Sequence, residues 1–161
     1  MTKSGALLVS LFSRTMEILP QESRCWIAPI AHQAAETVIE TLVARKKNFA
    51  FSERSPAKKI QSGDWLCFYA ARIGIVGHCQ VNSSPERKAL DGVDPKYCWV
   101  ITLDNVRAYL DEPLVLNDGV RDRLDALRSF KEPHKWAGFV QVAHSITLHD
   151  FRILTRQDRA E

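Results

Sequence analysis

The pattern of apolar and polar positions is most regular between Ile60 and Val81. A polar Gln-Ser-Gly-Asp turn leads into an aromatic and apolar run, Trp65 to Tyr69. A short link, Ala70 to Gly74, separates this run from a second β-rich run, Ile75 to Val81. Apolar runs bounded by turn residues are typical of adjacent strands. The stretch therefore predicts two strands, around which the other elements can be placed.

The elements before this pair are a strand and a helix. The Trp and Ile residues of Arg24 to Ile30 predict a first strand that Pro29 ends. Apolar residues then recur at helical spacing from Ala31 to Val43, and three cations, Arg45 to Lys47, follow where the negative end of a helix dipole favours them. The next segment, Lys47 to Lys59, shows no clear period and is interpreted as irregular.

The segments after the pair predict further strands and one more helix. Asn82 to Tyr97 is loop-like, and Cys98 to Val106 predicts a strand that extends towards Leu110. Asn117 is a candidate N-cap for a helix that ends near Leu127.

The last part of the chain is predicted to return to β structure. Lys131 to Lys135 predicts a loop, Trp136 to Leu148 a strand, and Asp150 to Leu154 a short closing turn or strand. Strands interrupted by only two helices favour an α+β domain built on a small curved sheet or barrel.

The N-terminus is interpreted as an extension. Ala6 to Phe12 is a short apolar run, but Ser13-Arg14-Thr15 is a poor cleavage context for a signal peptide. Met16 opens a more regular start, so residues 1–15 are interpreted as an extension or the result of a misplaced start codon. We expect residues 1–23 to lie outside the fold and residues 24–157 to form a single domain. No stretch approaches the ~20 apolar residues of a membrane span, and we expect no membrane partner.

Composition places the chain among ordinary soluble globular proteins. It has 161 residues, of which 45% are hydrophobic and 25% are charged, and a formal net charge of +3. That charge permits a polyanionic partner without requiring one. The four cysteines form no Cys-x-x-Cys pair, and we expect them to be reduced core residues of a cytoplasmic protein.

Charge is unevenly distributed along the sequence. From Arg45 to Lys59 six basic residues face one acid, whereas Asp104 to Asp125 holds six acids and three arginines. The basic run is either a solvated loop or a rim that contacts phosphates. If it contacts phosphates, nucleic acid should avoid the acidic segment. The candidate phosphate contacts are Lys46, Lys47, Arg54, Lys58 and Lys59.

Signals for catalysis, metals and cofactors are weak. No pair of the five histidines has His-x-x-x-His spacing, and none lies with a cysteine at a zinc-ligand interval. The chain has no glycine-rich phosphate loop followed by a helix and no Gly-x-Ser-x-Gly elbow. We therefore predict no metal site, no cofactor and no catalytic residue. A small enzyme that uses Asp64, His78 or His144 is the alternative.

Aromatic residues offer a stronger signal. Trp26, Trp65, Trp99 and Trp136 each lie in or beside a predicted strand, and phenylalanine and tyrosine residues add to them. Most strand tryptophans belong to a core, but two or three of these could line a pocket in which a flat ring stacks. A basic rim beside such a pocket is the chemistry expected of a protein that reads a single extruded base.

Several segments, taken in order, also carry a family resemblance. They are Trp26-Ile27, Asn48-Phe49-Ala50-Phe51 with Ser55-Pro56, Ile60-Gln-Ser-Gly-Asp-Trp-Leu-Cys-Phe-Tyr, Val76-Gly77, Leu127-Arg-Ser-Phe before Trp136, and Ile146-Thr-Leu-His-Asp-Phe-Arg-Ile. With these segments the chain resembles the EVE domain family of the PUA-like superfamily, from about Arg24 to Thr155. The link Ala70 to Gly74 departs from the family pattern, because it is short and lacks the Ser-Pro often found there.

The resemblance implies a PUA-like fold, in which a curved sheet approaches a barrel and helices pack around it. It further implies a non-catalytic module that holds a modified base of DNA or RNA in an aromatic pocket. Carried over by matching position, the pocket candidates are Trp26, Phe49, Phe68, Tyr69 and Trp136. Because side chains alternate along a strand, only one of Phe68 and Tyr69 is expected to reach the pocket. A protein-interaction domain, with the tryptophans in its core, is the remaining alternative.

Overall fold

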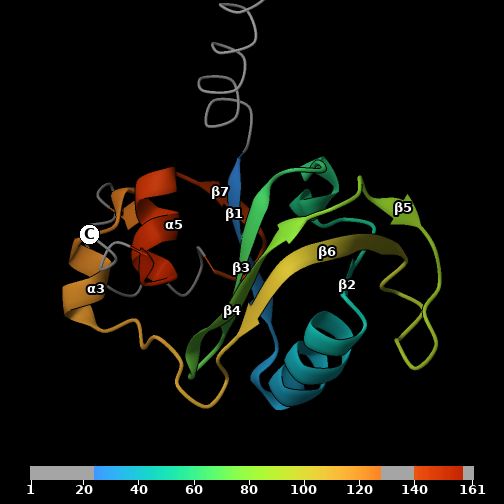
Figure 1. The fold of residues 1–161 in the computed structure, drawn as a ribbon, viewed down its shortest axis with the longest axis horizontal. Helices are drawn as coiled ribbons and strands as arrows, with labels where there is room; N and C mark the ends of the chain where they lie inside the picture. Colours follow the sequence, from blue (N-terminus) through green and yellow to red (C-terminus); the bar gives the residue numbers. More distant parts are fainter. Residues whose placement is uncertain (1–23, 128–139, 158–161) are drawn as a thin grey trace, which may run out of the picture.

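The fold is built on one strongly curled, mixed sheet (Figure 1). The computed structural model describes residues 24–127 and 140–157. Its strands are β1 (Cys25–Ile30), β2 (Asn48–Phe51), β3 (Trp65–Ala70), β4 (Gly74–Val81), β5 (Glu86–Arg87), β6 (Trp99–Ala108) and β7 (His144–Ile146). Its helical segments are η2 (His32–Ala34), η3 (Thr37–Arg45), η4 (Pro56–Lys59), α3 (Asp118–Asp122), η5 (Asp125–Leu127) and α5 (Leu148–Leu154).

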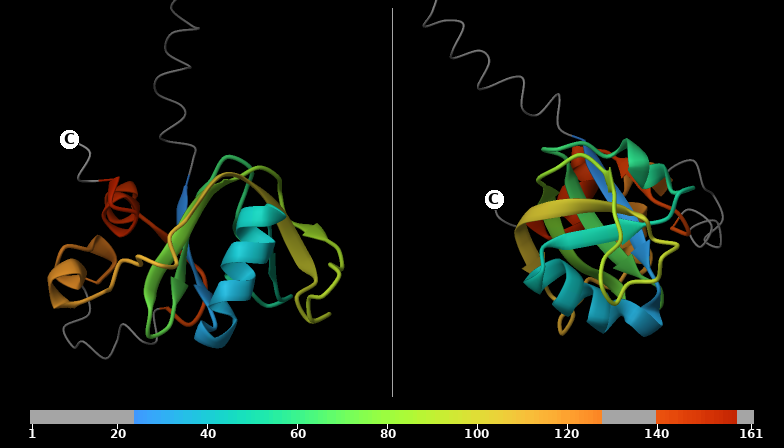
Figure 2. Two further views of the ribbon diagram at one scale, coloured as in Figure 1. Left: turned by 60° about the horizontal axis from the view of Figure 1, so that its bottom comes forward. Right: turned by 90° about the vertical axis from the view of Figure 1, so that its right-hand side faces the viewer.

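The strand order is β2-β6-β4-β3-β1-β7, and β5 adds to β6. β1 and β3 pair in parallel with Ala28 opposite Phe68, whereas the other pairs are antiparallel. β6 and β4 separate β2 from β3, yet the rings of Phe49 on β2 and Phe68 on β3 have centroids only 5.0 Å apart. The sheet therefore curls over itself, as Figure 2 shows, and the predicted α+β fold with a curved sheet is confirmed.

Side-chain alternation along β1 and β3 creates two cores. Trp26 and Phe68 belong to the core inside the curl, which Ile39 and Val43 of η3 also enter. Ile27 and Cys67, one residue further along each strand, belong to a second core with the C-terminal helices. In Figure 1, η3 and α5 accordingly lie on opposite sides of the central strands.

The predicted N-terminal helix exists, but its main segment η3 is a π-helix and not an α-helix. The N–H of Lys46 bonds the carbonyl of Thr41 at 3.0 Å, which is an i→i+5 contact. The buried residues Ala35, Ile39 and Val43 recur every four positions. All three belong to the inner core, so the predicted apolar stripe still faces it.

Two segments predicted as loop or strand take other structures. Asn48–Phe51 forms the edge strand β2, because Phe49 and Phe51 both point into the inner core. Leu148–Leu154 is the helix α5, whose N-cap Thr147 accepts the N–H of Asp150. Of the predicted strand from Trp136 to Leu148, only His144–Ile146 is a strand within the described residues.

Other boundaries differ from the predicted ones. Asn117 caps α3 as predicted, but this helix ends at Asp122 and a separate turn, η5, follows. The carboxylate of Asp150 accepts the N–H groups of Asp125 and Ala126, which starts that new turn. β1 runs through Pro29 and does not stop there. The predicted loop at residues 131–135 lies outside the described residues.

The cysteines are all free thiols, and Cys25, Cys67 and Cys79 are buried as predicted, whereas Cys98 is half-buried. Among residues 24–127 and 140–157, no helix has the length and apolar character needed to cross a bilayer.

Candidate nucleic-acid interface

A groove of about 760 Å³ opens where the curled sheet fails to close, between β2 and the ends of β1 and β3. We call it the Tyr69 groove. Its walls combine strand ends, the loop after β2, the β3–β4 turn and the segment before β7. Its lining residues are Ala28, Pro29, Ile30, Ala31, Phe49, Ala50, Phe51, Ser52, Arg54, Ser55, Ala57, Tyr69, Ala71, Arg72, Tyr97, Val140, Gln141, Val142 and Ala143. The volume falls within the ~300–1,000 Å³ of small-molecule pockets, which suits a nucleoside.

Strand pairing leaves backbone groups available in this groove. β1 and β3 run in parallel, so their C-terminal ends meet at one place, with Pro29 opposite Tyr69. β7 pairs with β1 only at Cys25–Ile27. No described strand pairs with the outer edge of Ala28–Ile30. The carbonyl of Arg24 accepts the Trp65 N–H, so by strand alternation Ala28 and Ile30 face β3 and Pro29 faces outward. Because proline has no N–H, this edge offers a ligand the Pro29 carbonyl as an acceptor.

Aromatic rings line the groove from three elements that are distant in sequence. Phe49 comes from β2, Tyr69 from β3 and Tyr97 from the loop before β6. Tyr97 is 38% exposed, and the Lys96 ammonium lies 5.2 Å from its ring centroid. Flat rings of this kind can stack on a nucleic-acid base.

The charge of the groove is positive. Arg54 and Arg72 line it, and its described lining residues include no Asp or Glu. Both arginines are exposed. Neither has a hydrogen bond or ion pair with another residue in the described ranges. Arg72 occupies the left-handed region (φ 70°) in the β3–β4 turn. Two uncompensated guanidinium groups beside flat rings favour an anionic ligand such as a phosphate-linked base.

The loop that carries Arg54 is fixed by its neighbour Glu53. The Glu53 carboxylate accepts hydrogen bonds from Trp99 Nε1 (2.9 Å) and Lys58 Nζ (2.6 Å) and forms an ion pair with Arg87. The charged groups of Lys58 and Arg87 also lie 5.1 and 5.0 Å from the Trp99 ring centroid. We call Glu53 and these three partners the Glu53 anchor, which ties the β2–η4 loop to β5 and β6.

The Glu53 anchor predicts an acid-sensitive loop. Side-chain hydrogen bonds from Lys58 and Trp99 lower the pKa of Glu53 from 4.5 to about 2. Because the pKa of Glu53 is lower in the folded state than in the unfolded state, the anchor stabilises the fold above pH 4.5. This stabilisation is lost as the pH falls towards 2. We expect the Glu53 side-chain carbon resonance to titrate near pH 2, and Glu53→Gln to remove this pH dependence. In the control Glu112→Gln, Glu53 should titrate as in the wild type. A Glu53 titration near pH 4.5 would contradict the anchor.

A second groove of about 490 Å³ adjoins the first and shares Pro29, Ile30, Ala31, Phe49, Ala50 and Tyr97 with it. It continues between η3 and the loop before β6, and Lys46 lines it. Asp91 and Asp94 line it too, so the adjoining groove is less suited to phosphate than the Tyr69 groove.

Trp26, predicted as a pocket residue, belongs to the inner core. It is 3% exposed and lines none of the grooves described above. Its indole N–H donates to Asp64 Oδ2 at 3.0 Å, and the Arg24 guanidinium lies 5.2 Å from its ring centroid. The geometry gives Trp26 a structural role, in which it ties β1 to the turn before β3.

Phe68 and Tyr69 face opposite ways, as strand alternation predicts. Phe68 is fully buried against Phe49, whereas Tyr69 lines the groove. Phe49 is buried as well, but part of it lines both grooves. Phe49 and Tyr69 therefore both line the Tyr69 groove, although they pack against different cores, whereas Phe68 does not line it. Trp136 lies outside the described residues.

The predicted phosphate contacts separate in space. Arg54 lines the Tyr69 groove and Lys46 the adjoining one. Lys58 belongs to the Glu53 anchor, and Lys47 donates from Nζ to the carbonyl of Ala44 at 3.2 Å. Lys59 is exposed and lines neither groove.

The residues considered for an enzyme do not line the Tyr69 groove. The Asp64 carboxylate accepts the backbone N–H groups of Arg24 and Gln61 and the indole N–H of Trp26. His78 lies with Nδ1 3.0 Å from the Tyr109 hydroxyl, and burial, with a smaller effect of Arg107, lowers its pKa to about 4. His144 lies on β7, opposite Ile27 of β1.

The buried thiols are not activated either. Burial raises the pKa of Cys25 to about 11 and that of Cys79 to about 12, and it raises the pKa of Cys67 well above its ordinary value. A protonated thiol is a poor nucleophile, so these three side chains are suited to packing.

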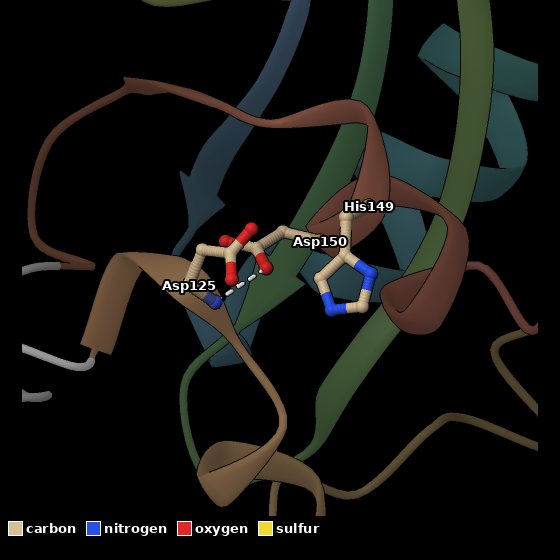
Figure 3. A group of neighbouring side chains, drawn as sticks. All are labelled: Asp125, His149 and Asp150. Carbon is tan, nitrogen blue, oxygen red and sulfur yellow. Dashed lines mark hydrogen bonds between the residues drawn. The ribbon is translucent and has the colours of Figure 1, made fainter.

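Asp125, His149 and Asp150 bring potential metal-ligand atoms within 4.8 Å of one another (Figure 3). Both oxygens of Asp150, which is 1% exposed, already accept backbone N–H groups, from Asp125 at 2.6 Å and Ala126 at 2.9 Å. His149 Nε2 lies 3.2 Å from the carbonyl of Arg123. The cluster therefore joins η5 to α5, and its hydrogen bonds explain it without an ion.

Arg72 and Tyr97 are groove residues that the sequence did not single out. Arg72 had a usable signal, because a cation in the link between two predicted strands must lie at a sheet end. Tyr97 had none, since only the curl of the sheet brings its loop beside Phe49.

The fold has counterparts among solved structures of YTH domains. A structure titled as the Mmi1 YTH domain has a TM-score of 0.58 at 14% sequence identity and covers 86% of this chain and 76% of that chain. A second, titled as the crystal structure of an Mmi1 YTH domain complex with RNA, has a TM-score of 0.57 at 16% identity, with 86% and 79% covered. No protein-family model and no curated protein matches the chain. The likeness shows a shared fold, and the EVE resemblance stays a prediction.

Proposed function

We propose that the chain is a nucleic-acid-binding module that accepts a single modified base into the Tyr69 groove. One observation carries the proposal: exposed Arg54 and Arg72 lie at a nucleoside-sized groove that Phe49, Tyr69 and Tyr97 also line. In this proposal the base stacks on the aromatic rings, the Pro29 carbonyl on the unpaired edge of β1 accepts a hydrogen bond from the base edge, and the arginines contact the flanking phosphates.

RNA is the favoured partner, because the neighbouring YTH structures include complexes titled with RNA. The EVE resemblance supports the finer statement that the base is modified. The absence of an acid from the described lining supports binding of a phosphate-linked ligand. The free thiols are consistent with a reducing compartment, and we propose a cytoplasmic location.

The test measures binding by fluorescence anisotropy to single-stranded oligonucleotides of one sequence. The central base is plain, methylated on an exocyclic amine or methylated on a ring carbon, in both RNA and DNA. We expect one modified RNA to bind more tightly than its plain counterpart. Tyr69→Leu removes the stacking ring, which is worth about 1–3 kcal/mol per base, and should weaken binding by about 5- to 150-fold.

The matched variant Tyr69→Phe keeps the ring and should retain the preference for the modified base. Circular dichroism melting of each variant separates lost binding from lost folding. Equal affinity for plain and modified oligonucleotides, together with wild-type binding by Tyr69→Leu, would refute the proposal.

A further inference from the structure

A third groove, of about 590 Å³, lies at the opposite end of β1 from the Tyr69 groove. We call it the Trp65 groove. It is bounded by the starts of β1 and β3, by β7 and by α5. Its lining residues are Arg24, Cys25, Trp65, Gln80, Ser145, Ile146, Leu148, Phe151, Arg152 and Gln157.

The charged side chains among the described lining of the Trp65 groove are both arginines. Arg24 and Arg152 line it, and no Asp or Glu is among its described lining residues. None of the six acids of the Asp104–Asp125 segment lines this groove. Arg152 is exposed and makes no hydrogen bond or ion pair within the described part of the chain. Burial raises the pKa of the Cys25 thiol, the Asp64 carboxylate adds to that rise, and the charge of Arg152 opposes it.

Arg24 retains donors for a ligand although it has partners in the protein. Its Nη2 donates to the carbonyl of Lys59 at 2.7 Å, and its Nε lies 3.9 Å from Asp64 Oδ2. A guanidinium carries five N–H donors, and the Arg24 side chain is 43% exposed. These partners hold the guanidinium at the groove entrance with unused donors.

Trp65 supplies a flat ring. It is half-buried and packs on Phe151, with ring centroids 6.1 Å apart and planes 52° apart. Leu148, 43% exposed, adds an apolar surface at the same groove. An indole, an exposed leucine and two arginines are the components of a site for a nucleobase joined to a phosphate.

The two grooves are close enough for one strand of nucleic acid. Cys25 lines the Trp65 groove and Ala28 lines the Tyr69 groove. At about 3.3 Å per residue, these positions on β1 lie roughly 10 Å apart. Trp65 and Tyr69 also project from the same face of β3 and pack against the same core.

We propose that the Trp65 groove is a second nucleotide-binding site, which holds an unmodified nucleotide of the strand whose modified base occupies the Tyr69 groove. The base stacks on Trp65 beside Leu148, and Arg24 and Arg152 contact its phosphate. The identity of the ligand rests on the proposed function, whereas the site itself can be tested separately.

The experiment labels the full chain with 5-fluorotryptophan, and single Trp→Phe variants assign the four fluorine resonances. Adenosine 5′-monophosphate is the probe. We expect the Trp65 resonance to shift on titration, while the anchored Trp99 does not respond. Arg152→Glu should weaken this response by about tenfold or more, because it places a carboxylate opposite the phosphate. Lys88→Glu, an equal charge change at an exposed site outside the described grooves, should leave it unchanged.

Oligonucleotide length gives the second measurement. Arg152→Glu should weaken the binding of a ten-nucleotide RNA by about tenfold but leave the binding of a trinucleotide centred on the modified base unchanged. A Trp65 resonance that ignores the nucleotide, or that responds equally in Arg152→Glu, would overturn the site. A resonance that shifts with protein concentration alone would instead assign the groove to a second copy of the chain. Failure of the proposed function has a different signature: Trp65 responds, but Tyr69→Leu binds modified RNA like the wild type.

Discussion

Replacing Asp64 with alanine is expected to lower the free energy of unfolding by about 3–5 kcal/mol, as does removal of one partner from a buried charged network. Asp64 is 2% exposed. Its Oδ1 accepts the backbone N–H of Arg24, and its Oδ2 accepts the Trp26 indole N–H and the backbone N–H of Gln61, each at 3.0 Å. The alanine variant would leave all three donors without this acceptor, and hydrogen bonds to charged groups contribute about 1.5–3 kcal/mol each.

Chemical denaturation followed by circular dichroism measures this effect. Asp64→Asn keeps an acceptor oxygen but turns an NH₂ group towards at least one donor, so it should lie between alanine and the wild type. Asp111→Ala, at an exposed aspartate, should change stability by no more than about 0.5 kcal/mol. If the free energy of unfolding of Asp64→Ala lies within about 1 kcal/mol of the wild-type value, the carboxylate does not hold β1 to the turn before β3.

The hydrogen bonds of Asp64 explain why the sequence could place Trp26 in a strand but could not assign it a role. Trp26 lies in a strand, where a tryptophan can serve a core or a pocket equally well. Its indole N–H donates to Asp64, which is 38 residues away in the sequence, and only the parallel pairing of β1 with β3 brings the two residues together. Periodicity specifies which face of a strand a residue occupies, but not what covers that face.

Local patterns predicted the elements whose signals are local. The predicted runs Trp65 to Tyr69 and Ile75 to Val81 became β3 (Trp65–Ala70) and β4 (Gly74–Val81). The Asn117 side chain caps α3 by accepting the Val120 N–H. α5 also had such a signal, because Thr147 followed by Asp150 at the third helical position matches a capping pattern. The β-rich residues before it obscured that signal. The Tyr69 groove had no single local signal, because the two ends of the curled sheet form it.

The largest effect on binding is expected from the double variant Arg54→Glu/Arg72→Glu. Both arginines line the Tyr69 groove from loops. A reversed charge repels the phosphate that the arginine contacted, and like charges in contact cost several kcal/mol. We expect RNA affinity at low salt to fall on the order of 100-fold. The slope of log affinity against log salt, which is negative, should become shallower by about 1.4, since each phosphate contact on a single strand contributes about −0.7.

The salt series separates a groove from a general charge effect. Arg45→Glu/Lys88→Glu makes the same change in net charge at two exposed residues that line none of the described grooves. Long-range attraction alone would give both double variants the same loss of RNA affinity and the same salt slope. That loss would disappear near physiological salt, because the Debye length is then only about 8 Å. Direct contacts in the Tyr69 groove instead require that Arg54→Glu/Arg72→Glu loses more affinity than the control and that this loss persists at 150 mM salt. They also require a reduced preference for the modified base, since the flanking phosphates hold that base against Tyr69.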